Sequence, residues 1–113
     1  MITIPIIQLN RIPHSRLLVI RKAVKYTITM LEHDKMLPLE KVYLTIAQEV
    51  LYKQLNSKIE KQYPSKATTL KMPYYQADLL KLAFLNYEKD SSASQLDLTI
   101  IESLKLELCK QLF

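Results

Sequence analysis

The most informative property of this sequence of 113 residues is that it contains no glycine. Loops that cradle phosphate groups, turns that bind dinucleotides and the strained turn that presents a nucleophilic serine all use glycine, because their backbone adopts positive φ or approaches a ligand closely. The lack of glycine therefore argues against a P-loop NTPase, a dinucleotide-binding domain and an α/β-hydrolase. Tight two-residue β-hairpins are disfavoured for the same reason.

Cysteine and histidine are almost as scarce. A single cysteine, Cys109, cannot form an internal disulfide, which fits a reducing compartment. Together with His14 and His33 it cannot supply the three or four closely spaced ligands of a zinc site, and no glutamate stands three residues before a histidine as dinuclear carboxylate sites require. His33 is followed by Asp34 in a predicted exposed turn, where such a pair is typical of a solvated surface and not of a catalytic dyad. We therefore expect no metal, no cofactor and no enzymatic activity.

Long apolar runs are absent too. No stretch approaches the 18 or so apolar residues that indicate a membrane-spanning helix, and the start "MITIPIIQLNR" lacks the basic region and cleavage site of a secretory signal. Hydrophobic residues make up 49% and charged residues 24%, as in folded globular proteins. The sequence predicts one cytoplasmic domain over residues 1–113, without membrane contact, and its lysine, isoleucine, leucine and tyrosine bias suggests an AT-rich bacterial or phage genome.

Four segments have the periodicity of helices. They run from His14 to about Glu32, from Pro38 to about Gln62, from Pro73 to about Glu88 and from Gln95 to about Leu112. The last segment also alternates with period two in "LDLTI" and "LKLEL", but its length favours a helix, and Ser94 with Asp97 predicts a capping box at its start. The third segment is apolar nearly all round, which predicts a buried helix with Tyr74 and Tyr75 packed in the core.

Two short segments, Ile6–Ile12 and Ala67–Met72, alternate like β-strands. Aligning Pro13 with Pro73 pairs "RIPHSRLLVIRKAV" with "KMPYYQADLLKLAF", whereas a rival alignment of Pro5 with Pro73 implies a helix that Pro13 would break. The sequence therefore predicts a mainly α fold, with four helices arranged as two helical hairpins that are each preceded by a short strand (β-α-α twice). A plain four-helix bundle with extended linkers is the alternative.

Positive charge is concentrated toward the N-terminus. Residues 1–71 contain 12 lysines and arginines against 5 acidic residues, whereas residues 72–113 contain 4 against 6. Ten cations form two groups, Arg11, Arg16, Arg21, Lys22 and Lys25 in the first and Lys53, Lys58, Lys61, Lys66 and Lys71 in the second. Cations that share one face can bind phosphates or an acidic partner, although lysine-rich helix faces also serve solubility. These ten residues are the candidate contact residues for a nucleic acid or an acidic partner.

The opposite charge of the two parts also permits contact between copies of the chain, since the acidic C-terminal part of one could meet the basic part of another. Apolar residues extend to both ends of the chain, in "MITIPII" and "LCKQLF", and a partner could bury them. The sequence therefore predicts a small protein-protein interaction protein that self-associates or binds another protein. A nucleic-acid-binding accessory protein is the alternative, and no small-molecule substrate is predicted.

Overall fold

The computed structural model describes residues 6–33, 38–61, 67–90 and 93–112. The elements are β1 (Ile6–Ile12), α1 (His14–His33), α2 (Pro38–Glu49), η1 (Val50–Asn56), α3 (Ser57–Lys61), β2 (Thr68–Pro73), α4 (Tyr74–Tyr87) and α5 (Gln95–Leu112). Here η1 is a π-helix that connects α2 directly to α3. The described chain is mainly helical with a short two-stranded antiparallel sheet, and its C-terminal segment is a helix, as predicted.

The two predicted strands pair with each other as a sheet. The alternative prediction, a plain four-helix bundle with extended linkers, does not include such a pairing. The pairs on the inner face are Ile7 with Met72, Leu9 with Leu70 and Ile12 with Thr68. All six side chains are buried, while Gln8 and the exposed Lys71 opposite it lie on the outer face. A two-stranded ribbon is marginal alone in water, so its stability depends on packing this inner face against the helices.

A β-bulge interrupts the first strand. The pairing register shifts between Leu9 and Ile12, and Arg11 has a φ of 51° in the left-handed region. Simple alternation would turn Ile12 outward, three positions after the buried Leu9. The extra residue of the bulge instead returns Ile12 to the inner face, where it is buried. Glycine is the residue that usually adopts such a left-handed conformation. In this chain, which contains no glycine, an arginine occupies the position.

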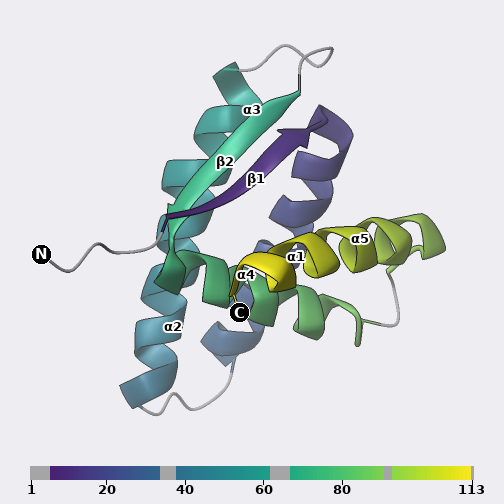
Figure 1. Cartoon of the computed structure of the whole chain (residues 1–113). Helices are drawn as coiled ribbons and strands as arrows, with labels where there is room; N and C mark the ends of the chain where they lie inside the picture. The colour runs from purple at the N-terminus through teal and green to yellow at the C-terminus, as the bar shows by residue number, and fades with distance from the viewer. Residues whose placement is uncertain (1–5, 34–37, 62–66, 91–92, 113) are drawn as a thin grey trace, which may run out of the picture.

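Helix α1 is at the centre of the molecule, because it contacts α2, η1, α3, α4 and α5. In Figure 1 the two-stranded sheet lies across the helices. The consecutive helices α2, η1 and α3 lie on one side of the sheet, and α5 crosses on the other side. Ile20, Ala23 and Val24 of α1 are fully buried, and complete burial of one aliphatic side chain contributes about 1.5–3 kcal/mol. None of the helices in the described ranges is long and apolar enough to cross a bilayer.

Helix α4 corrects one prediction. Tyr74 and Tyr75 were predicted to pack in the core, but they are 43% and 47% exposed at the start of the helix. The buried residue there is Gln76, which donates to Glu49 Oε1 at 3.0 Å and accepts from Gln54 Nε2 at 3.2 Å. The Tyr75 hydroxyl also donates to Glu49, at 3.3 Å. A satisfied amide can be buried at little cost, and the tyrosines keep their polar ends at the surface.

Candidate functional site

Helix α5 contacts the edge of β1 in addition to packing on α1 and α4. The Gln111 side-chain amide donates from Nε2 to the Gln8 carbonyl at 2.6 Å and accepts from the Gln8 backbone N–H at 2.9 Å. These are the two bonds that a neighbouring strand would make at this position. The amide of Gln111 thereby caps the open edge of β1 and fixes the C-terminal half of α5 beside the bulge.

A buried carboxylate holds the N-terminal half of α5. Asp97 Oδ2 accepts from the Tyr87 hydroxyl at 3.1 Å and from Lys22 Nζ at 3.3 Å, while the Asp97 N–H donates to Ser94 Oγ at 3.1 Å. The last bond confirms the Ser94 half of the predicted capping box, whereas the Asp97 carboxylate bonds to Tyr87 and Lys22. Burial, followed by the hydrogen bond to Asp97, raises the pKa of Tyr87 to about 12. Lys22, a candidate contact residue from the sequence, is thus engaged within the molecule.

A cleft of about 280 Å³ lies between β1, the first turn of α1 and α5. Its lining includes the buried apolar residues Leu9, Ile12 and Leu104. Its polar lining residues are Asn10, Arg11, Arg16, Ser103 and Glu107. Pro13 connects the strand to the helix, and its carbonyl accepts from the Arg16 N–H at 3.0 Å. The cleft therefore lies between a strand, the first turn of the helix that follows it, and the C-terminal helix of the chain.

The charges of this cleft are largely uncompensated. Within the described part of the chain, neither Arg11 nor Arg16 forms an ion pair, and the Glu107 carboxylate reaches only Lys110, at 3.9 Å. That pair is between neighbouring, exposed side chains of one helix, where ion pairs contribute little. The lining of the cleft therefore includes two arginines, from β1 and α1, and one glutamate, from α5.

The remaining basic residues of α1 do not join this cleft. Lys25 follows Arg16 by nine residues, which places it about 180° around the helix, and it is exposed. Arg21 is half-buried and, five residues after Arg16, about 140° around α1. Among the first group of candidates, the structure brings together Arg11 and Arg16.

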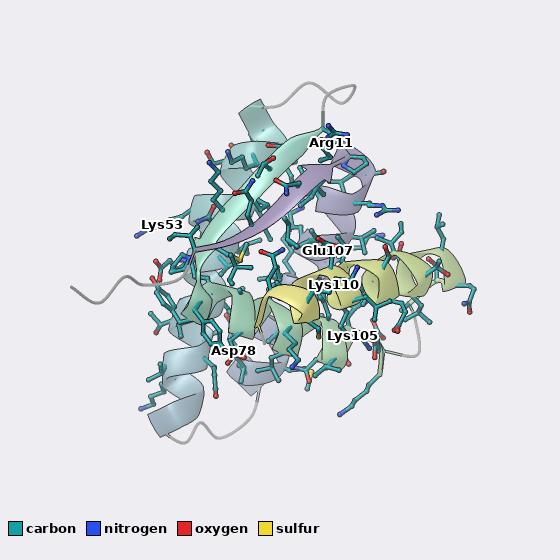
Figure 2. All side chains as sticks on the ribbon, viewed as in Figure 1. Arg11, Lys53, Asp78, Lys105, Glu107 and Lys110 are labelled. Carbon is teal, nitrogen blue, oxygen red and sulfur yellow. The ribbon has the colours of Figure 1, made fainter. Side chains whose placement is uncertain are left out.

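The second group is spread over several elements. Lys53 is exposed on η1, Lys58 is half-buried on α3, and Lys71 is exposed on β2. Figure 2 shows Lys53 well separated from Arg11 across the ribbon. Lys66 and Asp34 lie outside the described residues, as do the side chains of Lys61 and His33. The described cations of this group thus do not form one compact cluster with those of the cleft.

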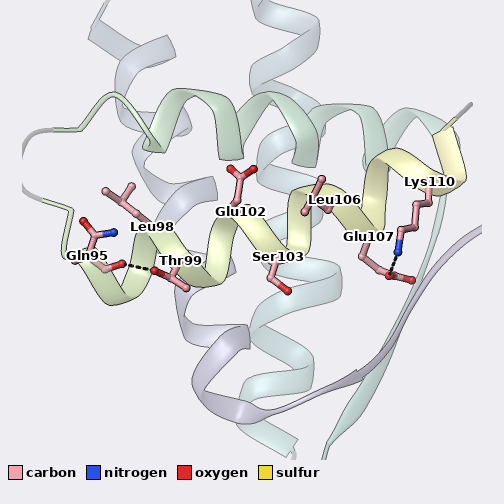
Figure 3. A pocket seen from close by; sticks show the side chains of 8 residues that line it. All are labelled: Gln95, Leu98, Thr99, Glu102, Ser103, Leu106, Glu107 and Lys110. Carbon is pink, nitrogen blue, oxygen red and sulfur yellow. Dashed lines mark hydrogen bonds and ion pairs between the residues drawn. The ribbon is translucent and has the colours of Figure 1, made fainter.

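The outer face of α5 is a second candidate surface. It has a shallow concavity lined by side chains of this one helix, as Figure 3 shows. Leu106 is 57% exposed and Leu96 is 69% exposed, whereas Ile101 and Leu108 on the opposite face are fully buried. The alternation in "LKLEL" was the available signal, because leucines two residues apart cannot all lie on one buried stripe of a helix.

Neither candidate surface could be compared with a characterised relative. The chain matches no protein-family model, no curated protein and no solved structure in the comparisons made with each. The assignment of its surfaces therefore depends on the geometry and chemistry of this chain. Glu107 and Ser103, which border both surfaces, were not singled out by the sequence.

Proposed function

We propose that the protein is a small interaction protein that self-associates through the outer face of α5. The observation that carries the proposal is the exposure of Leu106 in the middle of this face, on a helix whose other side is already in the core. A second copy is the occupant we propose, because this face can meet itself about a two-fold axis. Removing the exposed part of Leu106 from water is favourable, by less than the about 1.5–3 kcal/mol of complete burial.

The residue order along α5 suits a two-fold contact between antiparallel copies. With the axis between Glu102 and Ser103, each residue that lines the concavity meets another member of the same set in the second copy. The pairs are Gln95 with Lys110, Leu98 with Glu107, Thr99 with Leu106, and Glu102 with Ser103. Each charged side chain then faces an uncharged one, so the contact contains no directly opposed like charges.

A contact made by one face of an 18-residue helix is small. Stable specific interfaces bury roughly 1,600 Å² in total, and we expect this one to be smaller. The dimer should therefore be weak, with a dissociation constant in the micromolar range. A weak dimer fits a protein whose assembly is controlled by its concentration.

Sedimentation equilibrium over micromolar concentrations tests the proposal. The wild-type chain should show a monomer–dimer equilibrium, and Leu106→Lys should weaken it at least about tenfold, because two lysines would be buried in each dimer. Val42→Lys is the matched control, since Val42 is 53% exposed on α2. A wild-type monomer throughout the range, or an equal effect of the control substitution, would contradict the proposal.

Nucleic-acid binding is the alternative function. The observation that favours it is the exposure of Arg11 and Lys71 on the ribbon, in a chain of net charge +5. Binding to a mixed-sequence oligonucleotide should then fall steeply with salt, and the double change Arg11→Glu and Lys71→Glu should abolish it. If no oligonucleotide binds at low salt, this alternative is eliminated.

We also infer that the chain consists of two strand–helix–helix units, each with its helices as a hairpin. Contacts between α1 and α2, between α4 and α5, and between the antiparallel strands support this arrangement. In it, Pro13 and Pro73 occupy equivalent positions at the ends of their strands. Nuclear Overhauser contacts should run antiparallel between the helices of each unit, and parallel contacts would exclude it.

A further inference from the structure

We infer that the free edge of β2 binds an extended peptide segment of another protein, as a third strand that carries an acidic side chain opposite Lys71. The backbone N–H and carbonyl groups of Thr69 and Lys71 form the hydrogen bonds to this segment. The binding goes beyond the proposed self-association, because these residues belong to β2, whereas the proposed face of self-association belongs to α5.

The direction of the backbone groups of β2 follows from the contact between α5 and β1. The N–H and the carbonyl of Gln8 both bond to the Gln111 amide, so they point away from β2. Gln8 is paired with Lys71, and the two residues of an antiparallel pair direct their backbone groups either both toward each other or both away. The N–H and the carbonyl of Lys71 therefore point away from β1, and those of Thr69, two residues earlier in the strand, point to the same side.

The two edges of the sheet differ in what occupies them. The Gln111 amide caps β1, whereas within the described ranges the outward backbone groups of Thr69 and Lys71 have no hydrogen-bond partner. The main contacts of β2 are with β1, its strand partner, and with α4, which follows it directly in the chain. An unpaired row of N–H and carbonyl groups at the edge of a sheet is a template for a further strand.

The side chains on the outer face of the sheet determine the charge of the partner. Lys71 is exposed and forms no ion pair with another described residue. Gln8 lies opposite Lys71 and donates from its side chain to Asn10, and neither of these two residues is charged. A carboxylate on a third strand, directly opposite Lys71, would compensate its charge, and such opposite-charge pairs between strands are favourable.

A second copy of β2 fits this edge less well than an acidic segment does. The two-fold register that pairs all the outward groups sets Thr69 of each copy opposite Lys71 of the other. The two Lys71 side chains would then be diagonal neighbours, whose separation is roughly 7–8 Å, and lysines on edge strands are one means by which proteins avoid such pairing. An acidic segment makes the same backbone bonds without opposing like charges.

Hydrogen exchange and ¹⁵N–¹H spectroscopy of the full chain test the inference. In the free protein the Thr69 and Lys71 amides should exchange fast, whereas the Leu70 and Met72 amides, which bond to β1, should be protected. The acetylated and amidated peptide Val-Glu-Val-Thr-Val should slow the exchange of the Thr69 and Lys71 amides and shift their signals. Protection of these two amides without peptide, at any protein concentration, or fast exchange at saturating peptide, would overturn the inference.

Two changes in the peptide separate the backbone bonds from the charge. A peptide with lysine in place of glutamate keeps the backbone and should bind about fivefold more weakly, because an opposite-charge pair with Lys71 becomes a like-charge pair. A peptide with an N-methylated glutamate keeps the charge but loses the N–H that would donate to the Lys71 carbonyl, so it should also bind about fivefold more weakly. Equal binding of either peptide would contradict the inferred third strand.

Variants connect the binding to the named residues. Lys71→Glu should reverse the preference between the glutamate and lysine peptides, and Lys25→Glu, at an exposed position of α1, should leave it unchanged. Thr69→Pro removes an N–H that points away from β1, which an edge strand tolerates. It should weaken peptide binding about fivefold while the Leu70 and Met72 amides stay protected. An unchanged preference in Lys71→Glu would mean that the peptide binds elsewhere, and the inference would be wrong.

Leu106→Lys separates this inference from the proposed self-association. Leu106 lies on the outer face of α5, so a monomeric variant should still bind the glutamate peptide with the wild-type affinity. Loss of peptide binding in this folded variant would mean that the edge needs the second copy, which contradicts a site within one chain. Sedimentation of the same samples reports the state of association independently.

Discussion

Arg11 has a backbone conformation that is unfavourable for any residue with a Cβ atom. Its φ of 51° costs a residue with a Cβ roughly 1–2 kcal/mol, whereas glycine adopts it freely. Arg11→Gly should therefore fold more stably than Arg11→Ala by about 1 kcal/mol. Both substitutions remove the guanidinium, so the difference between them isolates the backbone.

Urea denaturation of the two variants measures this difference. The glycine variant should have the higher midpoint with an unchanged slope. An alanine variant as stable as the glycine variant would mean that residue 11 does not have a left-handed conformation in solution. The bulge would then be absent, and so would the position of Arg11 in the lining of the cleft.

Thr27 is a second residue in an unfavourable environment, because it is polar and occupies a buried position. It is 1% exposed in α1, and its hydroxyl has no hydrogen-bond partner among the described residues. A buried hydroxyl without a partner costs about 1–3 kcal/mol, and valine has nearly the same shape. Thr27→Val should therefore raise the free energy of unfolding by about 1 kcal/mol.

The exposed Thr29, whose hydroxyl donates to the Lys25 carbonyl at 3.0 Å, provides the matched control. Thr29→Val removes a hydrogen bond from a hydroxyl to a backbone carbonyl, whereas Thr27→Val removes none within the described chain. Thr29→Val should therefore leave the free energy of unfolding unchanged or lower it. Thermal denaturation of both variants measures the contrast. A lower stability of Thr27→Val than of wild type would show that the Thr27 hydroxyl has a partner after all.

Residue-scale prediction from sequence succeeded where the chemistry is local. Ser94 and Asp97 are three residues apart, and their capping bond was predicted from that spacing. Lys22 and Asp97 are 75 residues apart, and nothing in their neighbours signals the contact. Arg11 and Arg16 were candidates because of their charge, whereas Glu107 was not, since its relevance depends on which side of the ribbon α5 crosses.

At the scale of elements, one side chain of α5 makes two hydrogen bonds to the edge of β1. Gln111→Ala would leave the Gln8 N–H and carbonyl without their two partners. We expect a loss of about 1–2 kcal/mol in the free energy of unfolding. Hydrogen exchange should become faster at the Gln8 amide in particular, because the exchange of an amide reports the opening of its own bond.

Gln48→Ala, at an exposed position of α2, is the control for this prediction. It removes the same side chain from a helix without affecting the ribbon, so Gln8 exchange should remain slow. If Gln111→Ala leaves Gln8 protected, α5 does not cap the strand. The cleft between β1 and α5 would then lose part of its support.

The π-helix η1 shows why an element can be predicted while its geometry is not. The apolar stripe in residues 38–62 predicted one continuous helix, and α2, η1 and α3 follow each other without an intervening loop. Val50, Leu51 and Leu55 are buried in η1, as an α-helical stripe would also place them. A π-helix differs in which carbonyl each N–H reaches, and side-chain periodicity does not specify this locally.

At the scale of the whole molecule, the mainly helical fold and the existence of both strands followed from periodicity and proline positions. The bulge at Arg11 could not be predicted, because it results from the need to keep Ile12 beside Leu9 on a face that packs against helices. The cleft depends on the same packing. The sequence therefore predicted the elements better than the surfaces that their packing creates.

The contacts of Tyr87 make the stability of the whole molecule sensitive to alkali. Tyr87 is buried, its hydroxyl donates to Asp97, and its ring meets Tyr26 edge-on at 6.0 Å. These contacts join α1, α4 and α5, and the pKa of Tyr87 is raised from 10.0 to about 12. Ionisation would place a second negative charge beside the Asp97 carboxylate, so the folded state favours the protonated phenol.

The sign of the pH dependence follows from this pKa. Between about pH 10 and 12 the unfolded chain has released the Tyr87 proton and the folded chain has kept it, so stability falls as pH rises. Lysine ion pairs weaken over the same range, and Lys105, whose pKa is raised mainly by its hydrogen bond to Glu88, contributes to that background. The Tyr87 contribution is therefore measured as the difference between wild type and Tyr87→Phe.

Urea denaturation at several pH values through this range should show a steeper loss of stability for wild type than for Tyr87→Phe. Tyr74→Phe, which changes a tyrosine at an exposed position, should follow the wild-type curve. Absorbance near 295 nm should also show that Tyr87→Phe removes a tyrosine that ionises at about pH 12. Parallel stability curves for wild type and Tyr87→Phe would mean that the phenol of residue 87 is not held by Asp97, and that the junction of α1, α4 and α5 is looser than its geometry indicates.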